Sequence, residues 1–522
     1  MSDTPWLTII GLGEDGLDGL CNASRDLLTQ TTCIMGAERH LSLLPSNATA
    51  EHIIWPVPFS DGVEQLLARR GTPTVMLASG DPFWFGAGTT LAKQLTPGEW
   101  RAFPGRSAFS MIAARMGWPL EYTLCLGLHA APLTRLRPHL APNRQIIITL
   151  RDGAAVTKLG HYLQDQGFGA SACTVFEALG GPRERVSESK AQTLGDHSFA
   201  HPVSVAIAVS GAGDVVPLAT GRPDAWFDND GQITKRAVRA LTLSALAPRP
   251  YEHLWDIGGG SGSIAIEWLL SDPSLQATTI EARADRAERI KANAAKLGAD
   301  RLTVIHGTAS QVLTDLPAPD VVFVGGGLSP ALLTHLETLP PGTRIVANAV
   351  TLESEAMLTE TQARLGGNLM RVEISDVVEI GPKTRLARGL SHHAMEPCDM
   401  IVAGFGFSSK ATTDSLRDAL RRACAATDIS APHALATVED KALSLGPLKE
   451  EFGLPVCPIP QEKIASQPTT TQSPRVAETR NTGSVAEAAA LAAAGPGARL
   501  LTPRVHAQDR LASCALAQGN PG

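Results

Sequence analysis

The sequence predicts an α/β protein of three domains, the second of which is a doubly wound parallel sheet. Residues 256–262 read Asp-Ile-Gly-Gly-Gly-Ser-Gly, a glycine turn between an apolar strand and a helix. Strand-like and helix-like segments alternate on both sides of this turn. At 522 residues the chain is too long for one hydrophobic core, and its 43% hydrophobic and 19% charged residues are typical of globular α/β domains.

Composition and charge disfavour several classes of protein. No apolar run approaches the roughly 20 residues of a membrane helix. The N-terminus lacks a basic region followed by a long apolar stretch, so we expect a cytoplasmic protein that does not contact a membrane. Eight scattered cysteines without a Cys-x-x-Cys pair indicate reduced thiols. The formal net charge of −7 disfavours a nucleic-acid partner, and we expect a small-molecule substrate instead.

The first segment, residues 1–215, contains three glycine turns, two of which follow predicted strands at 6–10 and 74–78. The turns read Gly11-Leu-Gly13, Gly80-Asp81-Pro82-Phe-Trp-Phe85 and Pro104-Gly105-Arg106-Ser107. Residues 11–16 match Gly-x-Gly-x-x-Gly, but the acid-tipped strand of a dinucleotide site does not follow at the required distance. A second half begins with a strand near 145–149 and ends with one at 203–209.

These turns, in this order, resemble those of the tetrapyrrole methylase family, in which S-adenosylmethionine (SAM) lies between two α/β lobes. The resemblance implies a two-lobed fold and assigns the donor cleft to Gly11, Gly13, Gly80, Asp81, Phe85 and Ser107. The family pattern Pro-Gly-x-Ser-Ser ends in Ala108 here, so one hydroxyl is missing. An ordinary turn between strand and helix remains the alternative for residues 80–82.

The second segment, residues 230–395, carries the pattern of a nucleotide pocket. A strand at 251–257 precedes the glycine turn, and a helix begins at Ser263 with unpaired N–H groups at its start. A strand at 277–280 ends in Glu281, an acid placed to accept hydrogen bonds from ribose hydroxyls. Further strands, expected at 302–305, 321–324 and 344–348, complete the alternating order. The sequence therefore predicts a SAM site at this turn.

The spacing Asp-x-Gly-x-Gly-x-Gly resembles motif I of class I SAM-dependent methyltransferases. The order of the turns is similar to that of decarboxylating precorrin methyltransferases, which begin with Thr-Lys before a helix and carry a Gly-x-Ala turn after the third strand. The resemblance assigns SAM binding to Thr234, Gly258, Gly259, Gly260, Ser261, Gly262, Glu281 and Ala309. A helix N-cap is the alternative for Thr234.

The third segment, residues 398–522, begins with a strand at 400–403 that leads into Gly404-Phe-Gly406. It resembles the small accessory domain found in cobalamin pathways. Lys410 and Lys441 are candidates to contact an acidic ligand, and a solvated lysine is the alternative for each. We expect a surface loop over 467–483 and a helix over 484–494 with Ser484 as its cap.

Together the three segments resemble the family of decarboxylating precorrin-6 methyltransferases of cobalamin biosynthesis. That resemblance implies methylation of a reduced precorrin-6 at C5 by the first domain and at C15 by the second. It also implies loss of CO₂ from the ring C acetate, precorrin-8 as product, two SAM sites, and a homo-oligomer, either a dimer or a tetramer. The alternative is an RNA-modifying SAM-dependent methyltransferase, for which a basic strip and base-stacking aromatic residues are expected.

Few residues suggest a direct chemical role. Lys235 and Arg236 lie close to the predicted donor site and are candidates to bind acidic side chains of the macrocycle. Further candidates are Arg283 and Lys383; a surface charge is the alternative for all four. His392-His393 has no third ligand in view, so no metal site is predicted. Glu177 could accept a proton or be an ordinary strand-end carboxylate, and no catalytic residue is assigned.

Overall fold

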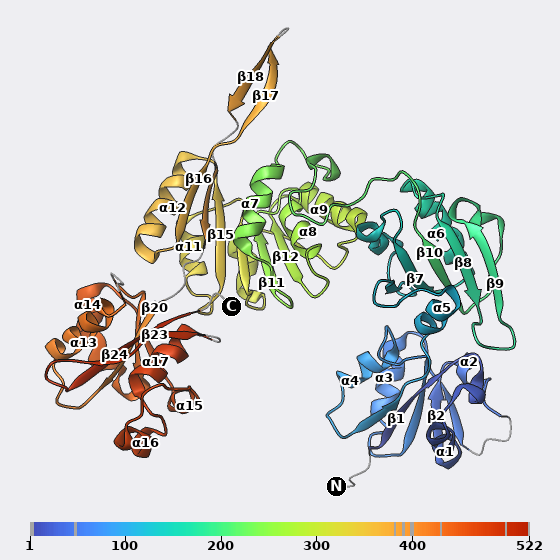
Figure 1. Ribbon diagram of the computed structural model, residues 1–522, viewed down its shortest axis with the longest axis horizontal. Helices are drawn as coiled ribbons and strands as arrows, with labels where there is room; N and C mark the ends of the chain where they lie inside the picture. Colours follow the sequence, from blue (N-terminus) through green and yellow to red (C-terminus); the bar gives the residue numbers. More distant parts are fainter. Residues whose placement is uncertain are drawn as a thin grey trace. The chain divides into compact units, whose positions relative to one another are not determined.

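In the computed structural model, shown in Figure 1, the chain forms several β-sheets in succession, most of them covered by helices. It describes residues 5–45, 50–380, 383–388, 392–396, 401–427, 431–495 and 498–519, without the side chains of 376–400. Two compact units, residues 1–216 and 217–522, divide the chain. In the part of the chain that is described, no helix is long and apolar enough to cross a membrane.

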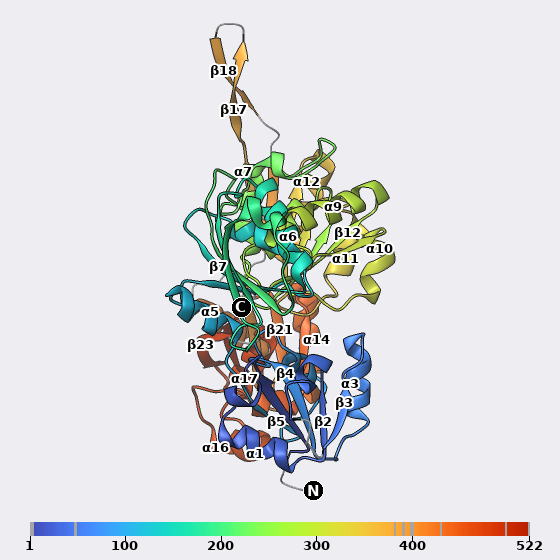
Figure 2. The same cartoon turned by 90° about the vertical axis from the view of Figure 1, so that its right-hand side faces the viewer.

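The first sheet is parallel and has the strand order β3-β2-β4-β1-β5. Its strands are β1 (Leu7–Leu12), β2 (Cys33–Gly36), β3 (Glu51–Ile54), β4 (Thr74–Ser79) and β5 (Trp100–Phe103). Its helices are η1 (Gly16–Gly19), α1 (Asn22–Gln30), α2 (Glu38–Leu41), α3 (Phe59–Leu67) and α4 (Ala87–Ala92). Helices α3 and α4 pack on one face and α1 and α2 on the other, so β1 is buried on both sides and is apolar apart from Thr8. Figure 2 shows α1 and α3 on opposite sides of this sheet.

The second sheet is mixed and has the order β6-β7-β10-β8-β9. Its strands are β6 (Leu124–Gly127), β7 (Gln145–Leu150), β8 (Ala172–Glu177), β9 (Arg185–Lys190) and β10 (Val203–Ala208). Helix α5 (Ala108–Met116) packs on one face and α6 (Gly153–Asp165) on the other, with η2 (Leu133–His139) and η3 (Ala191–Asp196) beside α6. The first unit therefore contains two α/β lobes, as the sequence predicts.

The third sheet has the order β13-β12-β11-β14-β15-β19-β16, and its first five strands are parallel. The strands are β11 (His253–Ile257), β12 (Gln276–Glu281), β13 (Thr303–His306), β14 (Val321–Val324), β15 (Arg344–Ala349), β16 (Asn368–Val372) and β19 (His392–Glu396). Strands β17 (Ser375–Ile380) and β18 (Lys383–Arg388) pair only with each other among the described residues. The chain order reverses between β11 and β14, which is where ligands bind in sheets of this kind.

Helices cover both faces of the third sheet, which confirms the predicted doubly wound architecture. One face carries α7 (Arg236–Leu246), α8 (Ser263–Leu269) and α9 (Ala284–Leu297). The other carries α10 (Ala309–Val312), η5 (Leu313–Asp315), α11 (Pro330–Leu336) and α12 (Leu352–Leu365). The predicted strand at 251–257 starts two residues late, because Tyr251 adopts a left-handed conformation with φ +70° and is exposed.

The fourth sheet has the order β22-β21-β20-β24-β23. Its strands are β20 (Ile401–Phe407), β21 (Ala434–Val438), β22 (Val456–Ile459), β23 (Arg499–His506) and β24 (Ala512–Gln518). Its helices are α13 (Thr413–Ala425), η6 (Glu439–Leu445), α14 (Gly446–Phe452), α15 (Gln461–Ala465), α16 (Pro474–Arg480) and α17 (Val485–Ala494). The expected loop over 467–483 is wrong in part, because α16 begins at a proline in its first turn and ends at the left-handed Asn481.

Candidate functional site

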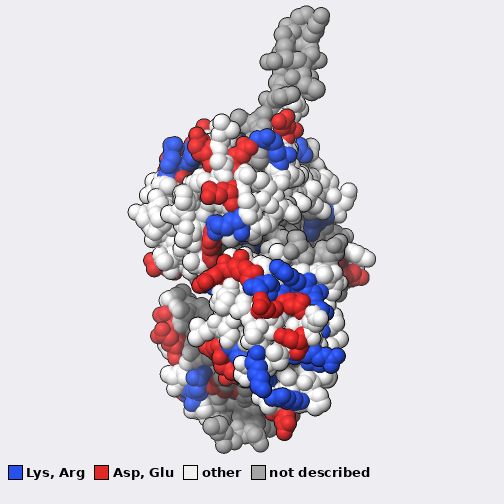
Figure 3. Space-filling view, turned by 90° about the vertical axis from the view of Figure 1, so that its left-hand side faces the viewer, with Lys and Arg blue, Asp and Glu red and all other residues white. Residues whose placement is uncertain are grey.

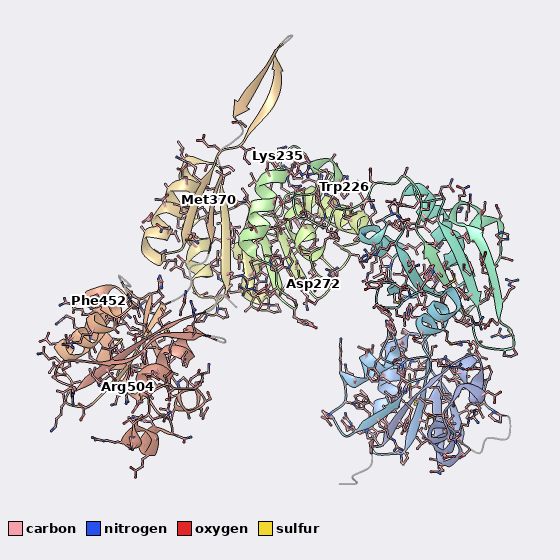
Figure 4. All side chains as sticks on the ribbon, in the orientation of Figure 1. Trp226, Lys235, Asp272, Met370, Phe452 and Arg504 are labelled. Atoms are coloured by element: carbon pink, nitrogen blue, oxygen red, sulfur yellow. The ribbon has the colours of Figure 1, made fainter. Side chains whose placement is uncertain are left out.

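A cavity of about 1670 Å³ opens at the carboxyl ends of the parallel strands of the third sheet. Its walls come from the loops after β11, β12, β13, β14 and β15, and from residues 220–240, which precede and begin α7. In Figure 4, Lys235 and Trp226 lie at one end of this domain and Asp272 at the other. The cavity therefore occupies the end of the sheet where its fold binds ligands.

The glycine turn after β11 forms the floor of this cavity. Gly258 and Gly260 have φ values of +75° and +60°, which side chains rarely allow. A Cβ atom at Gly258 would lie 2.7 Å from the backbone nitrogen of Gly326 in the loop after β14. Only glycine lets these two loops approach each other this closely.

Glu281 lies at the end of β12 and its carboxylate faces the glycine turn. One oxygen accepts a hydrogen bond from the backbone N–H of Gly260 at 2.8 Å, and the other accepts one from the N–H of Arg283 at 2.9 Å. The side chain is almost fully buried. Glu281 follows the last glycine of the turn by 19 residues in the sequence. In the structure Glu281 and the turn lie together at the edge of one cavity.

The other residues assigned to this donor site are close by, with one exception. Thr234, Gly259, Ser261 and Ala309 line the same cavity, whereas Gly262 lies outside its lining and is the N-cap of α8. The N-cap of α7 is Lys235, so the alternative role of Thr234 as a helix cap is wrong.

The candidate substrate-binding cations differ in their surroundings. Lys235 and Arg236 line the cavity and are exposed, and Arg236 donates to the backbone oxygen of Gly221 at 2.7 Å. Arg283 is instead paired with Asp285 at 2.9 Å, as in an ordinary surface ion pair. The side chains of Lys383, His392 and His393 lie outside the described residues.

Sequence reasoning gave no role to two polar residues, one beside the glycine turn and one on the cavity wall. Asp256 is fully buried next to the turn, and burial raises the pKa of its carboxyl to about 7. Asn348, at the end of β15, lines the cavity and donates from its amide to Thr242 Oγ1 at 2.9 Å. Asp256 is the first residue of the Asp-x-Gly-x-Gly-x-Gly motif, but its burial depends on strands that are distant in sequence.

In the first unit, the three predicted turns meet at the carboxyl edge of the first sheet. Gly80 has φ +52°, and its carbonyl accepts a hydrogen bond from the N–H of Gly105 at 3.0 Å. A Cβ atom at Gly11 would lie 1.8 Å from the Gly80 oxygen and 2.3 Å from the Gly105 nitrogen. The turns therefore form one compact backbone surface.

The side chains on this surface have mainly local partners. Asp81 accepts a hydrogen bond from the N–H of Phe83 at 2.9 Å, and Ser107 caps α5 by accepting one from the N–H of Ser110 at 3.1 Å. Phe85 has a left-handed backbone with φ +56°, and the residue is 47% exposed. A Cβ atom at Gly13 would lie 2.5 Å from Asp15 Oδ1.

Two buried acids in the first unit bind arginines. Glu14 accepts from Arg39 of the first lobe and from Arg183 of the second, at 3.0 Å for the latter. Glu177 is bound by both ends of the Arg185 guanidinium. Burial opposes ionisation of Glu177, but hydrogen bonds from Arg185 and from the N–H of Ala200 outweigh it, so its pKa is lowered. Glu177 thus has the surroundings of a structural carboxylate.

In the fourth sheet, the Gly404-Phe-Gly406 sequence serves helix packing. A Cβ atom at Gly404 would lie 2.1 Å from the backbone oxygen of Ala486, in the alanine-rich helix α17. Lys441 donates to the Phe407 carbonyl, and its ammonium lies 5.1 Å from the centre of that ring. Lys410 is exposed.

Family models match the chain in three places. The model for the tetrapyrrole (corrin/porphyrin) methylases matches residues 7–195, and the model for the precorrin methyltransferase domain matches residues 225–422. The model for the cobalamin synthesis G C-terminus matches residues 401–517. A precorrin-6Y C(5,15)-methyltransferase (decarboxylating) from Sinorhizobium sp is 47% identical over 388 residues, which is 73% of this chain and 93% of the relative. The chain belongs to this family.

Other relatives share parts of the same sequence. A precorrin-6Y C(5,15)-methyltransferase (decarboxylating) from Mycobacterium tuberculosis (strain CDC 1551 / Oshkosh) is 38% identical over 375 residues, 70% of this chain and 93% of the relative. A cobalt-precorrin-6B C(15)-methyltransferase (decarboxylating) from Salmonella typhimurium is 30% identical over 155 residues, 28% of this chain and 80% of the relative. The predicted family, with its fused accessory domain and its SAM-dependent C-methyltransferase chemistry, is confirmed.

Proposed function

We propose that the chain methylates a reduced precorrin-6 at C5 and C15 and removes CO₂ from the ring C acetate, giving precorrin-8. The observation that carries this proposal is the cavity of the third sheet, which is lined by the glycine turn, Glu281 and two exposed cationic side chains. At about 1670 Å³ the cavity exceeds the 300–1,000 Å³ typical of small-molecule sites, which suits a nucleoside donor and a macrocycle together.

The residues present suit a bound SAM molecule. Gly258 and Gly260 leave a cradle that a side chain would fill, and the buried hydroxyl of Ser261 has no partner among the described residues. Glu281 would accept hydrogen bonds from the ribose hydroxyls, and residues 258–261 of the glycine turn line the same cavity. When bound, SAM supplies an electrophilic methyl group, so the protein's main contribution is positioning.

Lys235 and Arg236 are proposed to orient the acidic side chains of the macrocycle. Both lie at the start of α7 on the cavity wall, and neither forms an ion pair with a carboxylate among the described residues. A charge-assisted hydrogen bond from either one would fix the position of the ring relative to the glycine turn. We assign no general base.

A second donor site is proposed at the meeting point of Gly11, Gly80 and Gly105. Its support is the compact backbone surface of the three turns together with the exposed ring of Phe85 beside it. We assign C5 methylation to residues 1–215, and C15 methylation with decarboxylation to 230–395. The relative that matches only 28% of the chain and is named for C(15) alone is consistent with this division.

Product analysis tests the proposal directly. Purified protein is incubated with SAM and reduced precorrin-6, and the product mass is followed with time. A gain of two methyl groups with loss of one CO₂ is expected. A product with one added methyl and its carboxylate intact would overturn the assignment of two sites.

We further propose a cytoplasmic homo-oligomer, a dimer or a tetramer, that does not bind nucleic acid. Basic and acidic side chains are interspersed on the face shown in Figure 3, which does not favour the RNA-modifying alternative. Residues 398–522 are proposed as a docking or carrier module for the intermediate. Removing them should leave methyl transfer in vitro intact, and abolished chemistry would refute that role.

A further inference from the structure

One wall of the third-sheet cavity is a segment with little regular structure. Residues 220–235, hereafter the strap, run from the end of the first unit to α7 and contain only the short helix η4 (Asp224–Trp226). Gly221, Gln232 and Thr234 of the strap line the same cavity as the glycine turn. Because the strap forms few backbone hydrogen bonds of its own, its shape depends on the side chains of neighbouring helices that bind it.

An ion cluster centred on the buried Glu267 and Arg239 holds both ends of the strap. Glu267 of α8 accepts hydrogen bonds from the N–H groups of Gly221 and Arg222 at 2.7 and 2.9 Å. It also accepts from the guanidinium groups of Arg222 and Arg239 at 3.2 and 2.6 Å. Arg239 of α7 in turn donates to the backbone oxygen of Thr234 and to Asp224 at 2.9 Å. The side chains of Glu267 and Arg239 are 0% exposed.

A second buried residue joins the strap to the glycine turn. Asn293 of α9 accepts from the N–H of Asp228 and donates to its carbonyl, both at 2.9 Å. The same amide group donates to the carbonyl of Ser261 at 2.9 Å. The strap and the turn therefore share a support, and a displacement of the strap changes the shape of the cavity that both line.

We propose that Arg239 and Glu267 are positioning residues that set the affinity of this cavity for the methyl donor. A buried carboxylate shared by two guanidinium groups contributes little net stability over an apolar packing, but it does fix the geometry of every group it binds. Here those groups are backbone atoms at both ends of the strap. The inference rests on the proposed function, because it takes the cavity to be a donor site.

The same domain contains a matched control. Arg344 and Glu252 form another buried ion pair, with Nη1 2.6 Å from Oε1 and side chains 4% and 11% exposed. Arg344 holds the carbonyls of Leu246 and Ala247, and neither it nor Glu252 lines the cavity. Substitutions in the two pairs should destabilise the domain to similar extents, but only one pair controls the strap.

The experiment titrates full-length protein with S-adenosylhomocysteine and follows hydrogen exchange in peptides that cover residues 253–262. Wild-type protein should show saturable protection. Glu267→Gln should weaken the apparent affinity at least about tenfold, and Glu252→Gln by less than about twofold. Arg239→Lys, which keeps the charge but loses the fork to Thr234 and Asp224, should weaken it more than Arg344→Lys.

The outcomes distinguish the positioning role of Arg239 and Glu267 from the existence of the donor site. Wild-type affinity in Glu267→Gln or Arg239→Lys, or equal losses in the control pair, would overturn the positioning role while the donor site stands. Absence of any protection of these peptides in the wild-type protein would overturn the donor site itself. If Glu267→Gln does not fold, the comparison of the two lysine variants decides.

Discussion

Asp256→Asn tests whether a buried carboxyl beside the glycine turn makes the stability of this domain depend on pH. The Asp256 side chain is fully buried, and burial raises the pKa of its carboxyl from an ordinary 3.8 to about 7. The carboxyl accepts a hydrogen bond from Thr279 Oγ1 at 3.2 Å and one from the backbone N–H of Ala265. Between these two values the folded chain keeps a proton that the unfolded chain releases. The free energy of unfolding therefore decreases as pH rises through this window, by about 4 kcal/mol in total, and is constant above it.

In the Asp256→Asn variant this decrease should be absent. The free energy of unfolding of this domain alone can be measured from urea-dependent hydrogen exchange of the β11 and β12 amides, corrected for intrinsic rates, from about pH 5 to about pH 8. Glu288→Gln, an exposed substitution on α9, should keep the wild-type dependence. Equal slopes in the wild-type protein and the Asp256→Asn variant, or a wild-type stability that rises through this range, would refute the reasoning.

Three further predictions concern donor and substrate binding. Glu281→Ala should weaken S-adenosylhomocysteine binding at the third sheet about tenfold or more, because a hydrogen bond to a charged group contributes about 1.5–3 kcal/mol. Hydrogen exchange in peptides that cover residues 253–262 measures this affinity. An unchanged affinity would contradict the assignment of Glu281 to the donor site. Gly11→Ala places a Cβ 1.8 Å from the Gly80 oxygen. S-adenosylhomocysteine should then no longer protect first-unit peptides from hydrogen exchange, while it should still protect peptides that cover residues 253–262. Loss of protection in both places would show that the effect is not local. Lys235→Ala should raise the KM for the tetrapyrrole about tenfold without changing the affinity for the methyl donor. Lys291→Ala on α9 is the control and should leave KM unchanged. An unchanged KM in Lys235→Ala would show that Lys235 does not bind the substrate.

The local patterns predicted the turns and the strands well because they depend on short-range backbone requirements. Gly258 and Gly260 adopt positive φ, and Glu281 meets the turn, as a strand–turn–helix–strand unit of this spacing requires. The same reasoning was less successful at segment ends and in polar regions. Thr234 precedes the helix cap instead of forming it, and α16 lies in a stretch rich in Thr, Ser and Pro.

By itself, the sequence determined the family, the α/β class, and the places where the backbone must turn, because glycine spacing and apolar runs act over a few residues. Only the tertiary structure decided which polar groups are buried together. Glu267 lies 28 residues from Arg239 and 45 from Arg222, and nothing in the local pattern pairs them. Burial makes an unpaired charge costly, so the partners of such a group are set by the packing of α7, α8 and the strap, and that packing exists only in the folded chain.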